Sequence, residues 1–268
     1  TGRLLEETLK VSITHIDTAC FLLEIGGLRI LTDPVFDPPG KIYSFGFGTF
    51  SKKYSAPALS PKEIGRIDLV LLSHDQHEDN LDKSGREFIK KIPLVLSTRP
   101  AAKRIPGITG LDEWQSFEIQ GTSVKVTATP AQHTGLRMLN PIAGKVIGFI
   151  LEWPGQTNGV TYISGDTVYF QGINRIAERY AKIDTAILHT GRAGFPYLTG
   201  ALHYTFHAKD ALKAAEVLAP RRIIPVHCAG WWHFREKEEH AHEVYSKSKF
   251  ADRIVQLSPG KPLVLGPE

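Results

Sequence analysis

The sequence has few cysteines and no long hydrophobic run. Its 268 residues include two cysteines, Cys20 and Cys228. Two cysteines are not the framework of a disulfide-rich secreted protein, although a disulfide between them stays open, and we expect a cytoplasmic location. The longest apolar stretches fall well short of the roughly 20 residues that a membrane-spanning helix needs. We therefore predict no stable insertion into a membrane.

A strong charge of one sign and the common nucleophile motifs are also missing. The formal net charge is +4, with Lys and Arg spread along the chain, which is too mild to indicate nucleic acid as a partner. Neither G-x-S-x-G nor G-x-x-x-x-G-K-[ST] occurs. The thiol of Cys228 directly follows His227, but a thiol in such a place is more often a packing residue than a nucleophile. A small-molecule substrate is the partner that we expect.

The pattern of apolar residues predicts a mixed α/β (α+β) chain. Strand-like runs dominate the first half, and strands and helices alternate later; helical spacing covers residues 83–92, 173–182, 207–219 and 235–249. No linker or repeat divides the chain, so we predict one domain over residues 1–268. Because the chain begins with Thr1, we expect that its start was trimmed or processed, and nothing in it resembles a signal peptide.

Residues 36–61 form the longest stretch without clear periodicity, and they are rich in Gly, Pro and aromatic residues. A loop of this length inside a compact domain is usually functional, for example as a lid or a wall of a site. The alternative is a surface excursion that its own aromatic side chains pack together. The sequence leaves both interpretations open.

Several predicted strands end in the same way, with an apolar run followed by a side chain that can bind a metal. These strand ends carry Asp33, the block that begins at His74, His133, Asp166 and His227. Loops at one edge of layered sheets converge in space, so these side chains are expected to meet. Imidazole and carboxylate together suit Zn²⁺, Mn²⁺ or Fe²⁺. In the block itself, alternate residues of an extended loop point the same way, so Asp75, His77 and Asp79 can face one centre.

This layout resembles the metallo-β-lactamase-fold hydrolases, and most closely the branch that contains N-acyl-phosphatidylethanolamine phospholipase D and the ascorbate-phosphate lactonases. Residues 21–36 are similar to the opening strands of that branch, and residues 67–82 stand where the family carries His-x-His-x-Asp-His-Leu-Asp. "TPAQH", "YISGDT" and "IIPVH" stand where it carries its third ligand His, its bridging Asp and its last His. The resemblance implies a four-layer αββα sandwich that holds one or two divalent ions, with zinc favoured and manganese or iron as alternatives.

The resemblance also implies two ligand sets. The first is Asp75 (or His74), His77 and His133, and the second is Asp79, Asn80 and His227, with Asp166 between the two ions. Two registers fit the altered block "HDQHEDN", and we prefer the one that puts Asp75 in the first slot. His74 is the alternative if the loop bulges by one residue. A neutral amide at Asn80 predicts a weaker second site, or one that favours Mn²⁺ or Fe²⁺.

An open metal position lowers the pKa of bound water to about 7 and supplies hydroxide at neutral pH. We therefore predict a hydrolase that attacks an ester, a lactone or a phosphodiester, in which Asp79 or Asp166 orients the water and takes its proton. Asp33 is expected to orient a ligand from outside the centre. The altered block favours the alternative, a non-catalytic relative that binds a metal or a ligand. A nuclease is disfavoured because no basic stripe is present.

Two later segments each allow more than one role. His203 and His207 precede a predicted helix and are candidates for an oxyanion donor or a general acid, or His207 caps the helix. The aromatic residues of segment 230–234 ("GWWHF") could wall an apolar pocket, or they belong to the core or to a contact between subunits of a homo-oligomer.

Overall fold

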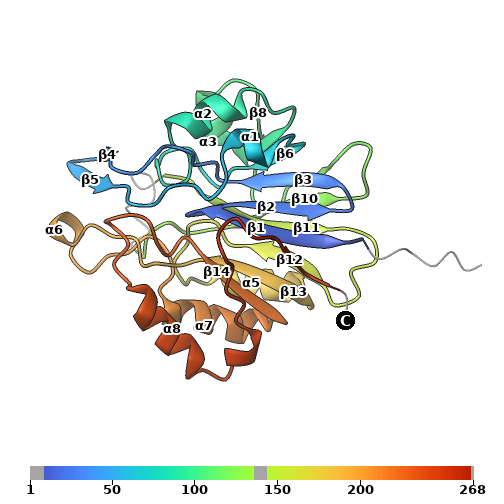
Figure 1. Cartoon of the computed structure of the whole chain (residues 1–268). Helices are drawn as coiled ribbons and strands as arrows, with labels where there is room; N and C mark the ends of the chain where they lie inside the picture. The colour runs from blue at the N-terminus through green and yellow to red at the C-terminus, as the bar shows by residue number, and fades with distance from the viewer. Residues whose placement is uncertain (1–8, 136–143, 267–268) are drawn as a thin grey trace, which may run out of the picture.

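Two β-sheets form the centre of the molecule (Figure 1). The structure, a computed structural model, describes residues 9–135 and 144–266. The first sheet has the strand order β15 (Leu263–Val264), β1 (Val11–Asp17), β2 (Cys20–Ile25), β3 (Leu28–Thr32), β6 (Leu69–Leu71), β7 (Val95–Thr98) and β8 (Ile108–Leu111). The second has the order β14 (Arg222–Val226), β13 (Ile183–His189), β12 (Val160–Ile163), β11 (Ile147–Glu152), β10 (Lys125–Pro130) and β9 (Ser116–Glu118).

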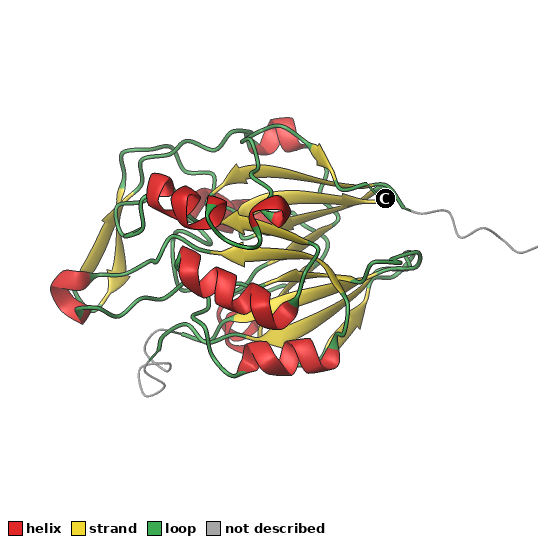
Figure 2. Cartoon of the chain, turned by 90° about the horizontal axis from the view of Figure 1, so that it is seen from below, coloured by secondary structure: helices red, strands yellow, loops and turns green. Residues whose placement is uncertain are grey.

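Helices cover the outer face of each sheet (Figure 2). Over the first sheet lie α1 (Pro61–Ile64), α2 (Lys83–Ile89) and α3 (Arg99–Arg104), and over the second lie α5 (Gly172–Arg179), α7 (Ala208–Leu218) and α8 (Glu238–Ser246). One hydrophobic cluster fills the space between the sheets, and one further cluster lies between each sheet and its own helices. This arrangement confirms the predicted αββα sandwich, the fold of the metallo-β-lactamases.

The helices that the sequence predicts are present, with shorter bounds. Helix α7 buries a row of apolar residues at helical spacing, Ala208, Ala211, Ala215 and Leu218, against the second sheet. It ends at Ala219, whose left-handed backbone (φ 47°) and the following Pro220 stop the helix as predicted. Helix α2 begins after the N-cap Asp82, which accepts a hydrogen bond from Gly85 N at 2.7 Å.

The sequence suggested that residues 36–61 form a loop without secondary structure, but the structure differs. They contain the hairpin β4 (Ile42–Gly46) and β5 (Thr49–Lys52), which stands out from one end of the sandwich. Residues 46–48 at its turn all have positive φ, and the large residues Ile42, Phe47 and Phe50 are exposed. The hairpin therefore lacks the buried apolar face by which a strand is recognised in a sequence.

A buried ion pair fixes the base of this hairpin to the body of the protein. The Lys53 ammonium lies 2.8 Å from Asp17 Oδ2 and 3.6 Å from Asp82 Oδ2. All three side chains are almost completely buried. The backbone adds to this attachment, because Tyr54 N donates to Gly230 O at 2.7 Å. The hairpin is thus held in a defined position beside the segment that follows β14.

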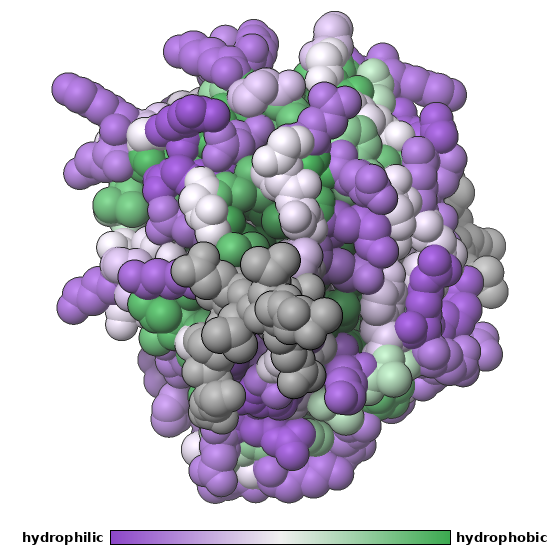
Figure 3. Space-filling model, turned by 90° about the vertical axis from the view of Figure 1, so that its right-hand side faces the viewer, coloured by the Kyte–Doolittle hydropathy of each residue, from purple (hydrophilic) through white to green (hydrophobic). Residues whose placement is uncertain are grey.

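The end of the sandwich opposite the hairpin is seen in Figure 3. The coloured part of that end is mainly hydrophilic, with smaller hydrophobic areas between the hydrophilic residues. Within residues 9–135 and 144–266, no helix combines the length and the apolar character that crossing a bilayer requires.

The two cysteines are free, so the disulfide that the sequence left open is not formed. Cys20 is buried, and burial raises the pKa of its thiol. Burial also raises the pKa of Cys228, to about 12. Because the thiolate is the reactive form, we expect neither thiol to react with Ellman's reagent in the native protein at pH 8 within minutes, and both to react in guanidinium chloride. Rapid native labelling of one equivalent would contradict this and would make a thiol nucleophile worth testing.

Candidate metal centre

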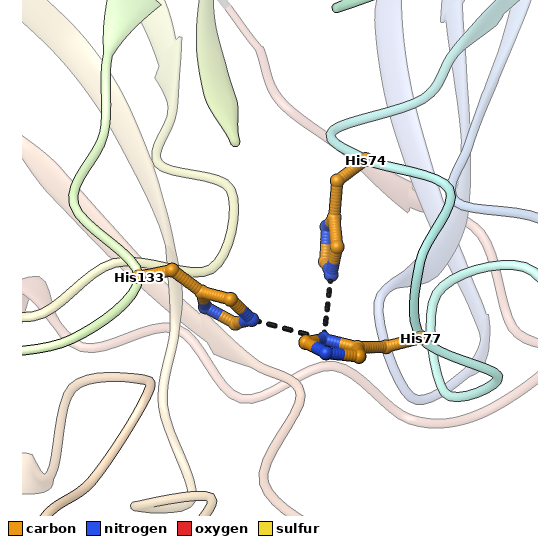
Figure 4. Close-up of side chains that lie close together, drawn as sticks. All are labelled: His74, His77 and His133. Carbon is orange, nitrogen blue, oxygen red and sulfur yellow. Dashed lines mark hydrogen bonds between the residues drawn. The ribbon is translucent and has the colours of Figure 1, made fainter. Parts of the chain in front are cut away.

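Three histidines meet where strands of the two sheets end (Figure 4). His74 and His77 lie in the loop after β6, and His133 follows β10. His77 Nδ1 lies 3.1 Å from His74 Nε2 and 2.9 Å from His133 Nε2. These three nitrogen atoms are close enough together to bind one ion. Chain segments more than fifty residues apart thus supply one compact cluster.

Burial keeps these three imidazoles uncharged. It lowers the pKa of His77 to about 4, helped by the charge of neighbouring His133, and it also lowers the pKa of His74 and of His133. Neutral imidazole is the form that binds a metal. Three nitrogens that point at one another in a buried place leave lone pairs facing each other unless a cation or a proton lies between them. The donor set therefore fits a divalent ion such as Zn²⁺.

A second group lies beside the first and consists of Asp79, Asp166 and His227. His227 Nε2 is 3.1 Å from Asp79 Oδ2 and 3.5 Å from Asp166 Oδ2. His227 directly follows β14, and its positive φ of 59° turns the chain sharply after the strand. The two groups are neighbours, since His74 Nε2 lies 4.0 Å from Asp166 Oδ2.

The second group is built to hold positive charge. Burial by itself raises the pKa of Asp79 and Asp166, but the facing histidines outweigh it and leave both values below the usual range. For His227, burial lowers the pKa, yet the charges of Asp166 and Asp79 raise it to about 9. Without a metal, a proton on His227 is thus the counter-charge for two buried carboxylates. A divalent cation would replace that proton, so this donor set also fits an ion.

Three more buried side chains surround these groups. Asp33 accepts a hydrogen bond from Ser73 N at 2.7 Å, and it lies 3.3 Å from the Asn80 amide. In either orientation of its amide, Asn80 donates an N–H to Asp166, at 3.2 or 3.3 Å. His189 Nδ1 is 2.8 Å from the same carboxylate. Asp33 lies outside the centre, where the sequence analysis placed it, and Asn80 and His189 orient Asp166.

The structure corrects the preferred position of Asp75. Its carboxylate does not face either group: Arg104 Nε donates to Asp75 Oδ2 at 2.8 Å, and the second arm of the guanidinium binds Oδ1. A two-point contact of this kind uses both carboxylate oxygens. His74 lies with His77 and His133 instead, which favours the alternative register.

His203 and His207 also lie away from the centre. His207 Nδ1 accepts a hydrogen bond from Asp210 N at 3.0 Å and so caps helix α7. His203 Nε2 lies 3.3 Å from the carboxylate of Asp210. Within the described ranges, neither histidine lines the cavity above the metal groups. The structure thus shows the capping role that the sequence offered for His207, and a catalytic role for it stays a prediction.

His233 was not among the residues that we predicted from the sequence. It lies in the aromatic segment after His227. Its ring is buried, and its Nε2 is 3.0 Å from Asp79 Oδ2. Ser51 Oγ, on strand β5, lies 2.6 Å from its Nδ1. The prediction for this segment concerned its tryptophans, of which Trp231 is buried and Trp232 is exposed. A histidine six residues after a predicted ligand was the signal that could have found this residue.

A cavity of about 250 Å³ opens above the two groups. His77, Asp79, His133, Asp166 and His233 form its base. Its walls are mostly apolar and come from the β4–β5 hairpin, from helix α6 (Pro196–Thr199) and from the segments that flank it, with the side chains of Phe45, Phe47, Phe195, Leu198 and Tyr204. Residues 36–61 therefore supply a wall of the site, one of the two roles that their length suggested.

Comparison with known families agrees with this geometry. The family model described as "Beta-lactamase superfamily domain" matches residues 28–228, which include both metal groups. The chain belongs to the beta-lactamase superfamily. The match begins at β3 and ends just after the last predicted ligand, so it covers the second sheet, part of the first sheet and the loops that carry the donors.

The similarity to individual relatives covers nearly the whole chain. A protein of Thermococcus onnurineus named a UPF0173 metal-dependent hydrolase is 28% identical over 260 residues, which is 95% of this chain and all of that protein. Two solved structures share the fold. "A possible metal-dependent hydrolase" from Veillonella parvula has a TM-score of 0.80 at 20% identity, covering 96% of this chain and 100% of that one. The isothiocyanate hydrolase from Delia radicum gut bacteria has a TM-score of 0.78 at 19% identity, covering 94% and 98%.

Proposed function

We propose that the protein is a metal-dependent hydrolase that cleaves a small, neutral, apolar substrate, such as an ester or a lactone. The observation that supports this most is the position of two buried donor groups at the base of one apolar cavity. His74, His77 and His133 would hold one ion, and Asp79, Asp166 and His227 a second. Zinc is the ion that imidazole-rich sites favour, and manganese or iron remain alternatives.

The ions would supply hydroxide at neutral pH and polarise the bond to be cleaved. The protein's own residues do the rest. Asp79 and Asp166 lie at the base of the cavity, where a carboxylate can orient the attacking water and accept its proton. Asn80 and His189 keep Asp166 in place. The apolar walls exclude bulk water, which strengthens the electrostatic interactions inside the cavity.

The walls also favour one class of substrate. Among the described residues that line the cavity, none is a lysine or an arginine, while five are large and apolar or aromatic. A phosphodiester carries a charge for which such a wall offers no partner, so an ester or a lactone fits better. The relative that is named an isothiocyanate hydrolase suggests a third neutral probe, an aryl isothiocyanate. The closer resemblance to the phospholipase D and lactonase branch remains part of this proposal.

A substrate panel tests the function. The protein is purified without chelator, its zinc, manganese and iron are measured by mass spectrometry, and hydrolysis of an aryl ester, an aryl lactone, an aryl isothiocyanate and a bis-aryl phosphate is compared with each ion added. We expect stoichiometric metal and turnover of at least one neutral probe, with the phosphate slowest. Metal bound without any turnover would favour a non-catalytic binding protein. If no metal binds under any loading condition, both the hydrolase and the non-catalytic metal-binding protein are contradicted.

The hairpin offers a matched pair of variants for the substrate pocket. Phe47 and Phe50 are both exposed on the hairpin, but Phe47 lines the cavity and Phe50 does not. Replacing Phe47 with alanine should lower kcat/KM for the preferred neutral probe about 10-fold, since apolar pocket contacts carry effects of this order. Phe50→Ala should leave it unchanged. Equal effects of the two replacements would mean that the cavity is not the substrate site.

A further inference from the structure

The second metal group contains one imidazole, that of His227. The block that the resemblance gives for the family carries one more histidine for this group. Asn80 stands where the resemblance places that histidine. Its amide donates to Asp166 in either orientation, so it supports a carboxylate instead of supplying a nitrogen ligand. Asp79, Asp166 and His227 then form the second group without a second ring nitrogen.

His233 brings an imidazole to this place from the other side. Its Nε2 lies 3.0 Å from Asp79 Oδ2, the same oxygen that His227 Nε2 approaches at 3.1 Å. The His233 ring is packed between aromatic residues: it stacks on Phe195 with centroids 5.2 Å apart, and Phe45 lies 4.7 Å away. The ring is buried at the base of the cavity. Its position is therefore fixed, and its free nitrogen is directed at the metal group.

The hydrogen bonds of His233 match those of the predicted ligands. A histidine that binds a metal almost always donates its other ring N–H to an oxygen. His133 Nδ1 has Tyr204 O at 3.1 Å, and His74 Nδ1 has Ser73 Oγ at 2.9 Å. His233 Nδ1 has Ser51 Oγ at 2.6 Å. With its proton on Nδ1, His233 would present the lone pair of Nε2 to the second group, as His133 and His74 do to the first.

We propose that His233 is a ligand of the second metal ion and supplies the imidazole that Asn80 does not. This inference rests on the proposed function, because it assumes that the chain binds metal. It adds a ligand that follows the last family block, and it makes the β4–β5 hairpin part of the metal site through Ser51. The hairpin would then set the affinity of the second ion as well as the shape of the pocket.

Co²⁺ binding by the full chain tests this ligand. The wild type, His233→Gln and His240→Gln are loaded with Co²⁺ and dialysed, and bound cobalt is measured. His240 is an exposed histidine of α8 and controls for the loss of an imidazole elsewhere. We expect two ions in the wild type and in His240→Gln, and one in His233→Gln, with the second ion at least 100-fold weaker. Circular dichroism shows whether each variant is folded.

Proton NMR of the cobalt forms separates a ligand from a residue that only orients Asp79. An N–H of a coordinated imidazole gives a strongly shifted, exchangeable signal. With excess Co²⁺ to keep the weakened second site filled, His233→Gln should lose one such signal. Ser51→Ala keeps the imidazole but removes its partner, so it should keep the signal with faster exchange. An unchanged signal count in His233→Gln, or two tightly bound ions, would overturn the inference. Absence of cobalt from the wild type would instead overturn the proposed function.

Discussion

Replacing His74 with alanine should empty the first metal group, whereas replacing Asp75 with alanine should leave it filled. His74 Nε2 points at His77 Nδ1 from 3.1 Å, while both oxygens of Asp75 bind Arg104. Loss of a residue that only orients a ligand weakens metal binding about 10–100-fold, so loss of a ligand should cost more. Metal content after dialysis, and competition with a chromophoric chelator, measure both variants.

Asp75→Ala is a close control for this experiment, because the two residues are adjacent and both are buried. It breaks an ion pair with a half-exposed arginine, which water can solvate, so the loss of stability should be about 1 kcal/mol or less. If Asp75→Ala loses the first ion and His74→Ala keeps it, Asp75 is the first ligand, as in the register that we preferred from the sequence. His77→Ala should remove the ion in either register.

Replacing Lys53 with methionine should destabilise the protein by about 3–5 kcal/mol, because it leaves two buried carboxylates without their cation. Lys53 is completely buried and lies 2.8 Å from Asp17 Oδ2 and 3.6 Å from Asp82 Oδ2. Methionine keeps most of the apolar stem, so the change tests the charge and not the packing. Urea unfolding at a fixed metal concentration gives the free energy of unfolding.

The matched control is Lys90→Met, which removes the same group from an exposed pair. Lys90 Nζ lies 2.6 Å from Glu87 Oε1, and both side chains are mostly exposed. Such pairs contribute about 0–1 kcal/mol. If the two methionine variants unfold at the same urea concentration, the buried pair is not what holds the hairpin in place.

The strand ends were the part of the site that the sequence predicted best. His133, Asp166 and His227 each follow a strand and meet at one edge, because an apolar run followed by a polar residue is a local pattern. The positions of Asp75 and His233 could not be predicted in the same way. Which of two adjacent residues faces the centre depends on the path of the loop, and on an arginine that comes 29 residues later in the chain. His233 depends on contacts with a hairpin that begins far upstream.

The hairpin shows a second limit of sequence patterns. Its exposed aromatic residues do not follow the alternation of apolar and polar residues that marks a half-buried strand, so nothing local distinguished it from a loop. What fixes it is a lysine whose two partners lie in other elements, Asp17 at the end of β1 and Asp82 at the start of α2. Local residues thus predicted the fold and most donors, and long-range contacts, among them pairs of charges, decided the remainder.

The distribution of donors along the chain has a consequence for its synthesis. The first group is complete once residue 133 has emerged from the ribosome, but the second waits for His227. At the usual rate of synthesis this interval is on the order of ten seconds. Strands β13 and β14, which finish the second sheet, pair in parallel with their neighbours, and such non-local pairing is slow. A nascent chain therefore holds the histidine cluster beside an incomplete sheet, and an ion captured early would join the two sheets before the chain is finished.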